Sequence, residues 1–293
     1  MEREARGRGA MRVNTTLVIN PKGGSGKTTV ATNLASYFAS KGVATTILDY
    51  DPQGSSLNWL RQRPLQAARI HAANGAPQKT GLRTVQMHVP ANTEQLIIDA
   101  PAGASGMLLH EMLLRAHSIL IPVAPSAIDI HATANFIRDL LLKGMIRQRN
   151  IRLAACANRV RSSMPVYQPL ERFLASLSLQ MLSRVSDSDV YLKSAETGIG
   201  VFEMEFAQSA AERQQLMPIV EWIEAPQIRL DPKVPQPRPS VLASMPGRGD
   251  LRVVTRASPP SSPKPRNRLS RGHQRSSPAI RANSRFIALT WAR

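Results

Sequence analysis

The sequence contains a single cysteine, Cys156, among its 293 residues. One cysteine cannot form an internal disulfide or supply a cysteine-rich metal or cluster site within the chain. No apolar run approaches the roughly 20 residues that a membrane-spanning helix needs. The opening residues MEREARGRGA lack the apolar stretch of a secretory signal peptide. We therefore expect a cytoplasmic protein without disulfides or transmembrane segments.

Acidic residues are scarce, and the excess of basic residues is concentrated near the C-terminus. The sequence has 38 Lys/Arg against 20 Asp/Glu, a formal net charge of +18. Residues 226–293 hold 14 of the basic residues, two aspartates and 11 of the 22 prolines. This composition predicts a disordered basic tail, with a reading-frame artefact as the alternative. We expect the folded domain to span residues 11–225, and residues 1–10 to be a disordered extension or a misassigned start.

Apolar periodicity predicts strands that alternate with helices between these ends. Short β-branched and apolar runs predict buried strands at 13–20, 43–51, 94–101, 118–125 and 152–159. Apolar residues at helical spacing predict helices at 28–42, 107–116, 128–149, 165–177 and 210–224. Alternating strands and helices indicate an α/β fold with a doubly wound, mostly parallel sheet and helices on both faces.

A glycine-rich loop, KGGSGKTT, lies between the first strand and the first helix. The strict phosphate-loop pattern requires glycine at position 21, where this sequence has Pro21. The loop still has what phosphate binding needs, because its three glycines let backbone N–H groups turn toward phosphate oxygens, and the helix N-terminus favours an anion. The binding residues are predicted to be Gly23, Gly24, Ser25, Gly26, Lys27, Thr28 and Thr29. Lys27 would bridge phosphates and the Thr28 hydroxyl would ligate Mg²⁺.

The same stretch resembles the deviant Walker A motif of the ParA/MinD family of P-loop ATPases. The resemblance makes Lys22 the signature lysine of that family, which reaches across a nucleotide-sandwich dimer to the ATP of the partner subunit. It also makes Thr29 a ligand of the α-phosphate. ATP and Mg²⁺ are therefore the expected cofactors, and a homodimer that forms on ATP binding is the expected assembly.

Two further motifs stand in the order that the family shows. ILDYDPQGS resembles its second motif, in which Asp51 would position the attacking water. LIIDAPAG resembles its Walker B motif, in which Asp99 would hold Mg²⁺ through water. Asn158, in CANRV, falls where the family places an adenine-reading asparagine. Lys22, Lys27 and Asp51 are thus the candidate catalytic residues.

The resemblance leaves two functions open. A ParA-like ATPase, here without an N-terminal helix-turn-helix module, would associate with the nucleoid and position a plasmid, a chromosome or a large assembly such as a carboxysome. Its hydrolysis would be stimulated by a ParB-like partner or a functional analogue. Its nonspecific contacts with double-stranded DNA are predicted at Arg159, Arg161, Arg184 and Lys193, and a second basic group lies on or after helix 128–149, at Arg138, Lys143, Arg147 and Arg149.

The alternative is a MinD-like ATPase anchored to a membrane by the C-terminal segment SRFIALTWAR. That segment is short, and its apolar residues do not keep to one helical face. We therefore favour the ParA-like function and do not expect membrane binding.

Overall fold

A parallel β-sheet of seven strands forms the centre of the computed structural model, which describes residues 13–77, 87–142, 145–161 and 167–226. The strand order is β3-β2-β4-β1-β5-β6-β7, and every pair of neighbours is parallel. The strands are β1 (Asn14–Val18), β2 (Thr45–Asp49), β3 (Ile70–Asn74), β4 (Gln95–Asp99), β5 (Ser118–Val123), β6 (Arg152–Val160) and β7 (Gln180–Ser186). The predicted N-terminal extension, and the predicted tail beyond Pro226, lie outside the described residues.

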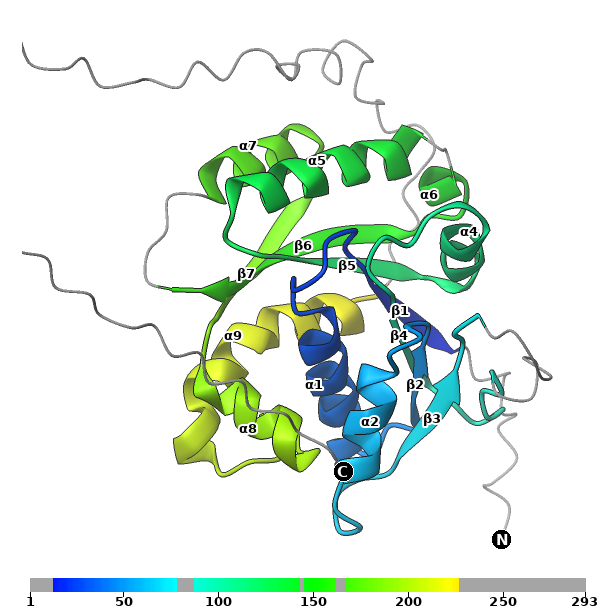
Figure 1. Ribbon diagram of the computed structural model, residues 1–293, viewed down its shortest axis with the longest axis vertical. Coiled ribbons are helices and arrows are strands. Elements are labelled where there is room, and N and C mark those ends of the chain that lie inside the picture. The colour runs from blue at the N-terminus through cyan, green and yellow to red at the C-terminus, as the bar shows by residue number, and fades with distance from the viewer. Residues whose placement is uncertain (1–12, 78–86, 143–144, 162–166, 227–293) are drawn as a thin grey trace, which may run out of the picture. The chain divides into compact units, whose positions relative to one another are not determined.

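Helices cover both faces of this sheet (Figure 1). One face carries α4 (Gly106–Arg115), α5 (Ala127–Leu142), α6 (Met145–Gln148) and α7 (Gln168–Ser176). The other carries α1 (Lys27–Ser40), α2 (Ser55–Gln62), α8 (Asp189–Thr197) and α9 (Phe206–Glu224). The prediction of a doubly wound α/β fold is therefore confirmed.

The central strands are buried on both sides, which explains their continuous apolar sequence. Successive residues of a strand point to opposite faces. Leu17 and Ile119 accordingly lie in the core cluster beneath α4–α7, whereas Val18 and Leu120 lie in the cluster beneath α1 and α9. Full burial of each such side chain contributes about 1.5–3 kcal/mol. The sheet is thus a rigid platform on which the loops at its edge are held.

The structure differs from the sequence expectation at the sheet edges and at some helix ends. Strands β3 and β7 and helix α2 were not predicted; the two strands are the edge strands, and their sequences IHAAN and QMLSRVS lack a continuous apolar run. The prediction of one helix at 128–149 was wrong, because α5 ends at Leu142 and α6 begins at Met145. The sequence has Gly144 between them, and glycine costs about 1 kcal/mol inside a helix. The last helix begins at Phe206, four residues before the predicted start.

Because all the strands are parallel, their carboxyl ends meet at one edge of the sheet. Strand β1 leads there into the glycine loop and α1, β2 into α2, β4 into α4 and β6 toward α7. Ligands of open α/β sheets bind in the crevice at this edge. The three motifs of the sequence all follow these strand ends.

Candidate nucleotide-binding site

The glycine loop is shaped by left-handed backbone and by contact with a distant strand. Gly26 immediately precedes α1 with φ 82°, a conformation that favours glycine. A Cβ atom at Gly26 would lie 1.9 Å from Nδ2 of Asn158. The same Nδ2 donates a 2.8 Å hydrogen bond to the carbonyl oxygen of Ser25. The end of β6 therefore braces the loop at the point where α1 begins.

Both lysines of the loop have their positions defined. The backbone N–H of Lys22 donates to Oδ1 of Asn20 at 2.9 Å, and Asn20 is itself anchored to the carbonyl oxygen of Pro122 at 2.7 Å. Nζ of Lys27 donates to the carbonyl oxygen of Lys22 at 3.0 Å. Burial lowers the pKa of Lys27, and the carboxylates of Asp99 and Asp51 oppose that shift. Lys27 thus lies folded along the loop, with two carboxylates close enough to influence its charge.

Asp99 ends β4 beside the first turn of α1. Its Oδ2 accepts a 2.8 Å hydrogen bond from the Thr28 hydroxyl, whereas its buried Oδ1 has no hydrogen-bond partner among the described residues. Burial raises the pKa of Asp99 to about 7, and the neighbouring carboxylate of Asp49 adds to the shift while Lys27 opposes it. A buried, unpaired carboxylate oxygen next to a threonine hydroxyl is the donor set that Mg²⁺ prefers.

Asp49 and Tyr50 hold the backbone that carries Asp51. Oδ1 of Asp49 accepts from the N–H of Asp51 at 2.9 Å, and its Oδ2 accepts from the Ser56 hydroxyl at 2.7 Å. On the other side, the fully buried Tyr50 donates from Oη to Oε1 of Glu111 at 2.9 Å. Consecutive side chains thus connect the strand end to α2 and to α4. The sequence analysis assigned no function to Asp49 or Tyr50. A signal for Asp49 was available, because it is an aspartate at the end of a buried strand, seven residues before Ser56.

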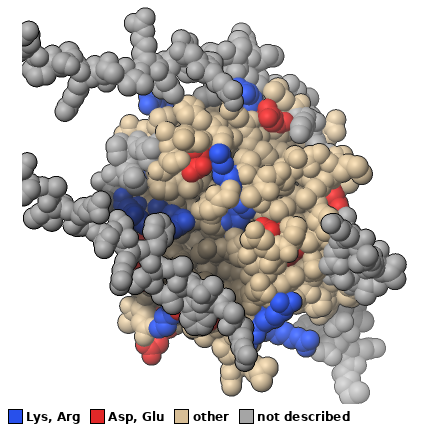
Figure 2. Space-filling view, viewed as in Figure 1, with Lys and Arg blue, Asp and Glu red and all other residues tan. Residues whose placement is uncertain are grey.

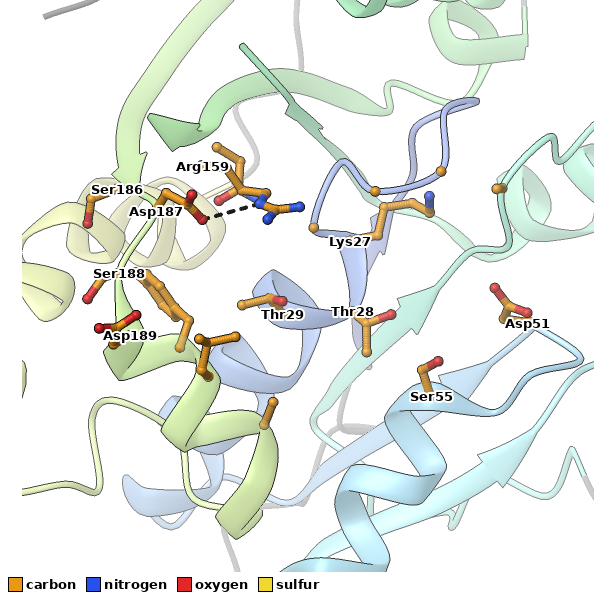
Figure 3. Close-up of a pocket in the computed structure, with 18 of the residues that line it drawn as sticks. Lys27, Thr28, Thr29, Asp51, Ser55, Arg159, Ser186, Asp187, Ser188 and Asp189 are labelled. Atoms are coloured by element: carbon orange, nitrogen blue, oxygen red, sulfur yellow. Dashed lines mark hydrogen bonds and ion pairs between the residues drawn. The ribbon is translucent and has the colours of Figure 1, made fainter. Parts of the chain in front are cut away.

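A cavity of about 830 Å³ lies over these groups. Figure 2 shows the hollow on this face of the molecule, with basic side chains near its rim. One end is lined by the glycine loop, Thr28 and Asp51, and the other by residues 186–189 and the first turns of α8 (Figure 3). Thr29 lies between the two ends in this view. The second end was not predicted, because it is formed by the segment that follows the unpredicted edge strand β7.

The basic residues predicted to contact DNA fall into two groups. Arg159 and Arg161 line the cavity and both bind Asp187, at 3.3 Å and 2.6 Å. Hydrogen bonds from Arg161, and then from Arg159, hold the pKa of Asp187 below its ordinary value. Arg184 and Lys193 lie elsewhere, paired with Glu171 at 2.7 Å and with Gln208 at 2.9 Å.

The second basic group is only partly described. Arg138 donates to Oδ1 of Asn135 at 3.0 Å, and Arg149 is exposed. Lys143 and the side chain of Arg147 lie outside the described residues.

The residues at the cavity fit a nucleoside triphosphate and Mg²⁺. Backbone N–H groups of residues 23–28 and the N-terminus of α1 suit the phosphates. Lys27 supplies a positive charge there, and Thr28 and Asp99 supply oxygen ligands of the kind a magnesium ion requires. Asp51 and Asn158 line the same cavity, although the Asn158 amide nitrogen is already engaged with Ser25. Lys22 precedes Gly23, the first residue of the loop that lines it.

The glycine loop lies between β1 and α1, at the carboxyl edge of a doubly wound sheet and beside aspartates at strand ends. This arrangement defines a P-loop nucleotide-binding fold. The family model described as the CobQ/CobB/MinD/ParA nucleotide binding domain matches residues 16–222. The chain belongs to this family, and the predicted membership of the ParA/MinD group is confirmed.

Named relatives and solved structures agree with this assignment. The chain is 23% identical to "Maintenance of carboxysome distribution protein A" of Halothiobacillus neapolitanus, over 65% of this chain and 87% of that protein. It is 32% identical to "Protein ParA" of Rhizobium radiobacter, over 39% of this chain but only 50% of that protein. Apo McdA of Cyanothece has the same fold, with a TM-score of 0.54 at 16% identity over 73% of this chain and 100% of that structure.

The Mg-ADP complex of the septum site-determining protein MinD of Pyrococcus horikoshii also has a TM-score of 0.54, at 16% identity over 73% of this chain and 96% of that structure. Within the described part of the chain, no helix is both long and apolar enough to cross a bilayer. Relatives with partition, carboxysome and septum-site names thus share one nucleotide-binding fold with this chain.

Proposed function

We propose that this protein is a ParA-type ATPase that dimerises on Mg-ATP, binds DNA nonspecifically and positions a cargo through partner-stimulated hydrolysis. One arrangement carries this proposal: Lys27, Thr28 and Asp51 line a single cavity large enough for a nucleotide. Asp99 accepts a hydrogen bond from the Thr28 hydroxyl, and the Lys22 carbonyl accepts one from Lys27. These residues come from all three motifs, and the family assignment supports nucleotide binding there.

ATP and Mg²⁺, when bound, supply the phosphoanhydride bond and the cation that neutralises its developing charge. On the protein side, Lys27 would exchange its contact with the Lys22 carbonyl for phosphate oxygens. The Thr28 hydroxyl and Asp99 would hold the metal, Asp99 through water. Asp51, whose backbone N–H is bound by the Asp49 carboxylate, would orient the attacking water. Thr29 would bind the α-phosphate.

Lys22 acts on the partner subunit. Its carbonyl oxygen accepts from both Lys27 and Ser25, and its N–H is bound to Asn20, so its backbone is fixed. The side chain is only partly buried, and no hydrogen bond of its ammonium group is recorded in the described part of the chain. A lysine supplied to phosphate charge from a second subunit stabilises that charge as an arginine finger does. Nucleotide binding is thereby linked to dimerisation.

DNA binding uses the basic residues that carry surface partners. Arg184 forms an ion pair with Glu171, and exposed ion pairs contribute only about 0–1 kcal/mol. Lys193 donates an exposed hydrogen bond to the amide oxygen of Gln208. Exchange of these partners for DNA phosphates therefore costs little. The contacts are to phosphates rather than bases, which makes the binding independent of sequence and sensitive to salt. The protein would then be cytoplasmic and nucleoid-associated.

The names of the relatives indicate the kind of cargo that this protein would position, but they do not identify the particular cargo. The relative covered over 87% of its length is named for carboxysome distribution, and others are named for chromosome partitioning. We propose a large cargo of this kind, such as a carboxysome, a plasmid or a chromosome, with a small ParB-like activating partner. The MinD-like alternative depends on residues 284–293, which lie outside the described residues.

The test is binding of the full chain to nonspecific double-stranded DNA with ATP or ADP, across a salt series. DNA binding that requires ATP and weakens steeply with salt is the expected result. Arg184→Ala and Lys193→Ala should each lower the salt slope by about one unit if the residue contacts a phosphate. Anionic liposomes form the parallel arm, and liposome binding without DNA binding would replace the proposal with the MinD-like function.

Two further variants test the assigned residues. Lys22→Ala should retain nucleotide binding but impair the ATP-dependent dimer and hydrolysis, as read by light scattering and phosphate release. Unchanged dimerisation would remove Lys22 from that function. Asp51→Ala should trap an ATP-bound dimer, and rapid hydrolysis by this variant would exclude Asp51 from positioning water.

A further inference from the structure

The turn Asn20-Pro21-Lys22 joins β1 to the glycine loop, and it departs from the strict phosphate-loop pattern at Pro21. Oδ1 of Asn20 accepts from the N–H of Lys22, two residues further along the chain, at 2.9 Å. Asparagine side chains favour turns that are closed by a bond of this kind. Proline at the middle position fixes its own φ near about −65° and has no N–H that could compete for Oδ1. The direction in which the backbone enters Lys22 is therefore set by the two residues before it.

The amide of Asn20 is held in one orientation by a neighbouring strand and a distant helix. Asn20 and Thr133 are both fully buried. Nδ2 of Asn20 donates to the carbonyl oxygen of Pro122 on β5 at 2.7 Å and to Oγ1 of Thr133 on α5 at 3.0 Å, which uses both of its N–H groups. A rotated amide would place its oxygen against the Pro122 carbonyl and its nitrogen against the N–H of Lys22. These contacts therefore direct the Asn20 oxygen toward Lys22.

The bond from Lys22 to Asn20 becomes more important once a nucleotide is bound. The Lys22 carbonyl accepts from Nζ of Lys27 at 3.0 Å and from the Ser25 hydroxyl at 3.3 Å. In the proposed ATP complex Lys27 turns to phosphate oxygens, which removes the shorter of these two bonds. Of the recorded bonds to the Lys22 backbone, this leaves the longer one from Ser25 and the 2.9 Å bond to Asn20.

Two glycines separate Lys22 from the rest of the phosphate-binding loop. Gly23 and Gly24 are both exposed, and Gly24 has a left-handed φ of 75°. Glycine lets the backbone change direction at little steric cost, so a shift on one side need not reach the other. The loop beyond them has its own support, because Asn158 donates to the Ser25 carbonyl at 2.8 Å. Loss of the Asn20 contact should therefore redirect Lys22 more than it disturbs the groups that bind phosphate.

We propose that Asn20 is a positioning residue for Lys22: its buried amide, oriented by the Thr133 hydroxyl, fixes the turn from which the Lys22 side chain reaches the partner subunit. This inference rests on the proposed function, because it requires that Lys22 acts on the nucleotide of the partner subunit. Its consequence is that ATP-dependent dimerisation depends on a hydroxyl of α5, a helix that none of the three motifs includes.

The experiment compares ADP binding, ATP-dependent dimerisation and ATP hydrolysis in variants of the full chain, each with Mg²⁺. Thr133→Val removes the hydroxyl and keeps nearly the same shape, so the Asn20 amide loses one of its two acceptors. It should weaken dimerisation and hydrolysis by about fivefold to tenfold, as expected for one buried hydrogen bond, and leave ADP binding within about twofold. Thr133→Ser keeps the hydroxyl and should behave as the unmodified protein does. Asn20→Ala should show the larger loss in dimerisation and hydrolysis.

Thr46→Val is the matched control. Thr46 is also fully buried and shares a 2.9 Å hydrogen bond with Thr93, but it lies near the start of β2 rather than at the glycine loop. This variant should leave dimerisation of the folded protein unchanged.

A spin label at position 22 reports the position of this residue without a partner subunit. Cys156 is the sole cysteine of the sequence, and burial raises the pKa of its thiol to about 12, so Lys22→Cys offers a selective site for labelling. In the nucleotide-free protein, adding Thr133→Val should make the label more mobile, which narrows the lines of its electron paramagnetic resonance spectrum. Adding Thr46→Val should not change the spectrum.

The outcomes separate the position of Lys22 from the ATP site itself. Unchanged dimerisation and hydrolysis in Thr133→Val would overturn the inference and leave the proposed function intact. An equal loss of ADP binding would overturn it as well, because the whole loop would then depend on this contact. Failure of the unmodified protein to dimerise with ATP, or full dimerisation of Lys22→Ala, would instead refute the proposed function and the inference with it. Thermal melting without nucleotide distinguishes lost binding from lost folding, and Thr133→Val decides if Asn20→Ala does not fold.

Discussion

Substitution of Gly26 by alanine tests how the glycine loop is held. Two separate costs arise at this position. The backbone has φ 82°, and the added Cβ atom would lie 1.9 Å from Nδ2 of Asn158 and 3.2 Å from its Cγ. The Asn158 side chain must therefore move, which breaks its hydrogen bond to the buried carbonyl of Ser25.

The magnitude follows from these two terms. An alanine in left-handed backbone costs about 1–2 kcal/mol. An unsatisfied buried acceptor costs a further 1–3 kcal/mol or so. We expect Gly26→Ala to lower the free energy of unfolding by about 3 kcal/mol, which is a large share of the stability of an ordinary domain.

Gly24→Ala is the matched control. Gly24 has a similar φ of 75°, but a Cβ atom there would meet no atom within 4 Å. This variant should carry only the backbone cost, and the lower chain entropy of the unfolded alanine variants affects both equally. Urea unfolding of the two proteins should therefore differ by about 2 kcal/mol at unchanged m-value.

Equal stability losses in the two alanine variants would refute this account of the loop. A double variant supplies a second check. In the protein with both Gly26→Ala and Asn158→Ala, the added Cβ atom no longer meets the Asn158 side chain. The hydrogen bond to the Ser25 carbonyl, which each single substitution breaks, is lost only once in this double variant. The two effects should then be less than additive by at least about 1 kcal/mol.

Three other predictions concern charged or hydroxyl groups around the sheet. Tyr50→Phe should lower the free energy of unfolding by about 1–2 kcal/mol, because it removes the hydrogen bond to Glu111, and urea titration measures this loss. Glu203→Ala should cost about 3 kcal/mol in the same assay, because it leaves Arg63, with only 6% of its side chain exposed, without its carboxylate. In the metal-free protein, burial raises the pKa of Asp99 to about 7. Its unfolded value is about 4, so the folded state keeps a proton that the unfolded state loses, and stability falls as pH rises between these values. Asp99→Asn should gain stability relative to the unmodified protein over that range and level off above it, as read from unfolding midpoints against pH.

Strand β1, the glycine loop and α1 could be predicted from sequence because their information is contiguous. Gly24 and Gly26, which precede Lys27, have left-handed backbone with φ of 75° and 82°. Glycine at these positions is a local sequence signal, and it is enough to indicate this conformation. The central strands were recognised because burial on both faces demands unbroken apolar runs. Asp51 and Asp99 were predicted because the stretches ILDYDPQGS and LIIDAPAG, at the ends of two such strands, resemble motifs of the family. Family membership followed from these three stretches.

The edges of the sheet could not be predicted in the same way. Strand β7 has a mixed sequence because it lies at the edge of the sheet and only one of its seven residues is fully buried, so no apolar run marks it. Without β7, the segment 186–189 could not be recognised as a wall of the nucleotide cavity. The same gap left the position of Arg159 and Arg161 in the cavity wall unpredicted, and their contacts with DNA stay a prediction.

The sequence by itself specified the groups at the glycine-loop end of the cavity: the lysines, the threonines, the strand-end aspartates and the backbone that carries them. Tertiary structure alone decided the contacts between distant segments, such as Asn158 with Ser25 and Arg159 with Asp187. The physical reason is that a glycine turn or a buried strand is specified by neighbouring residues. A bond between side chains far apart in sequence exists only after the sheet has placed their strands at one edge.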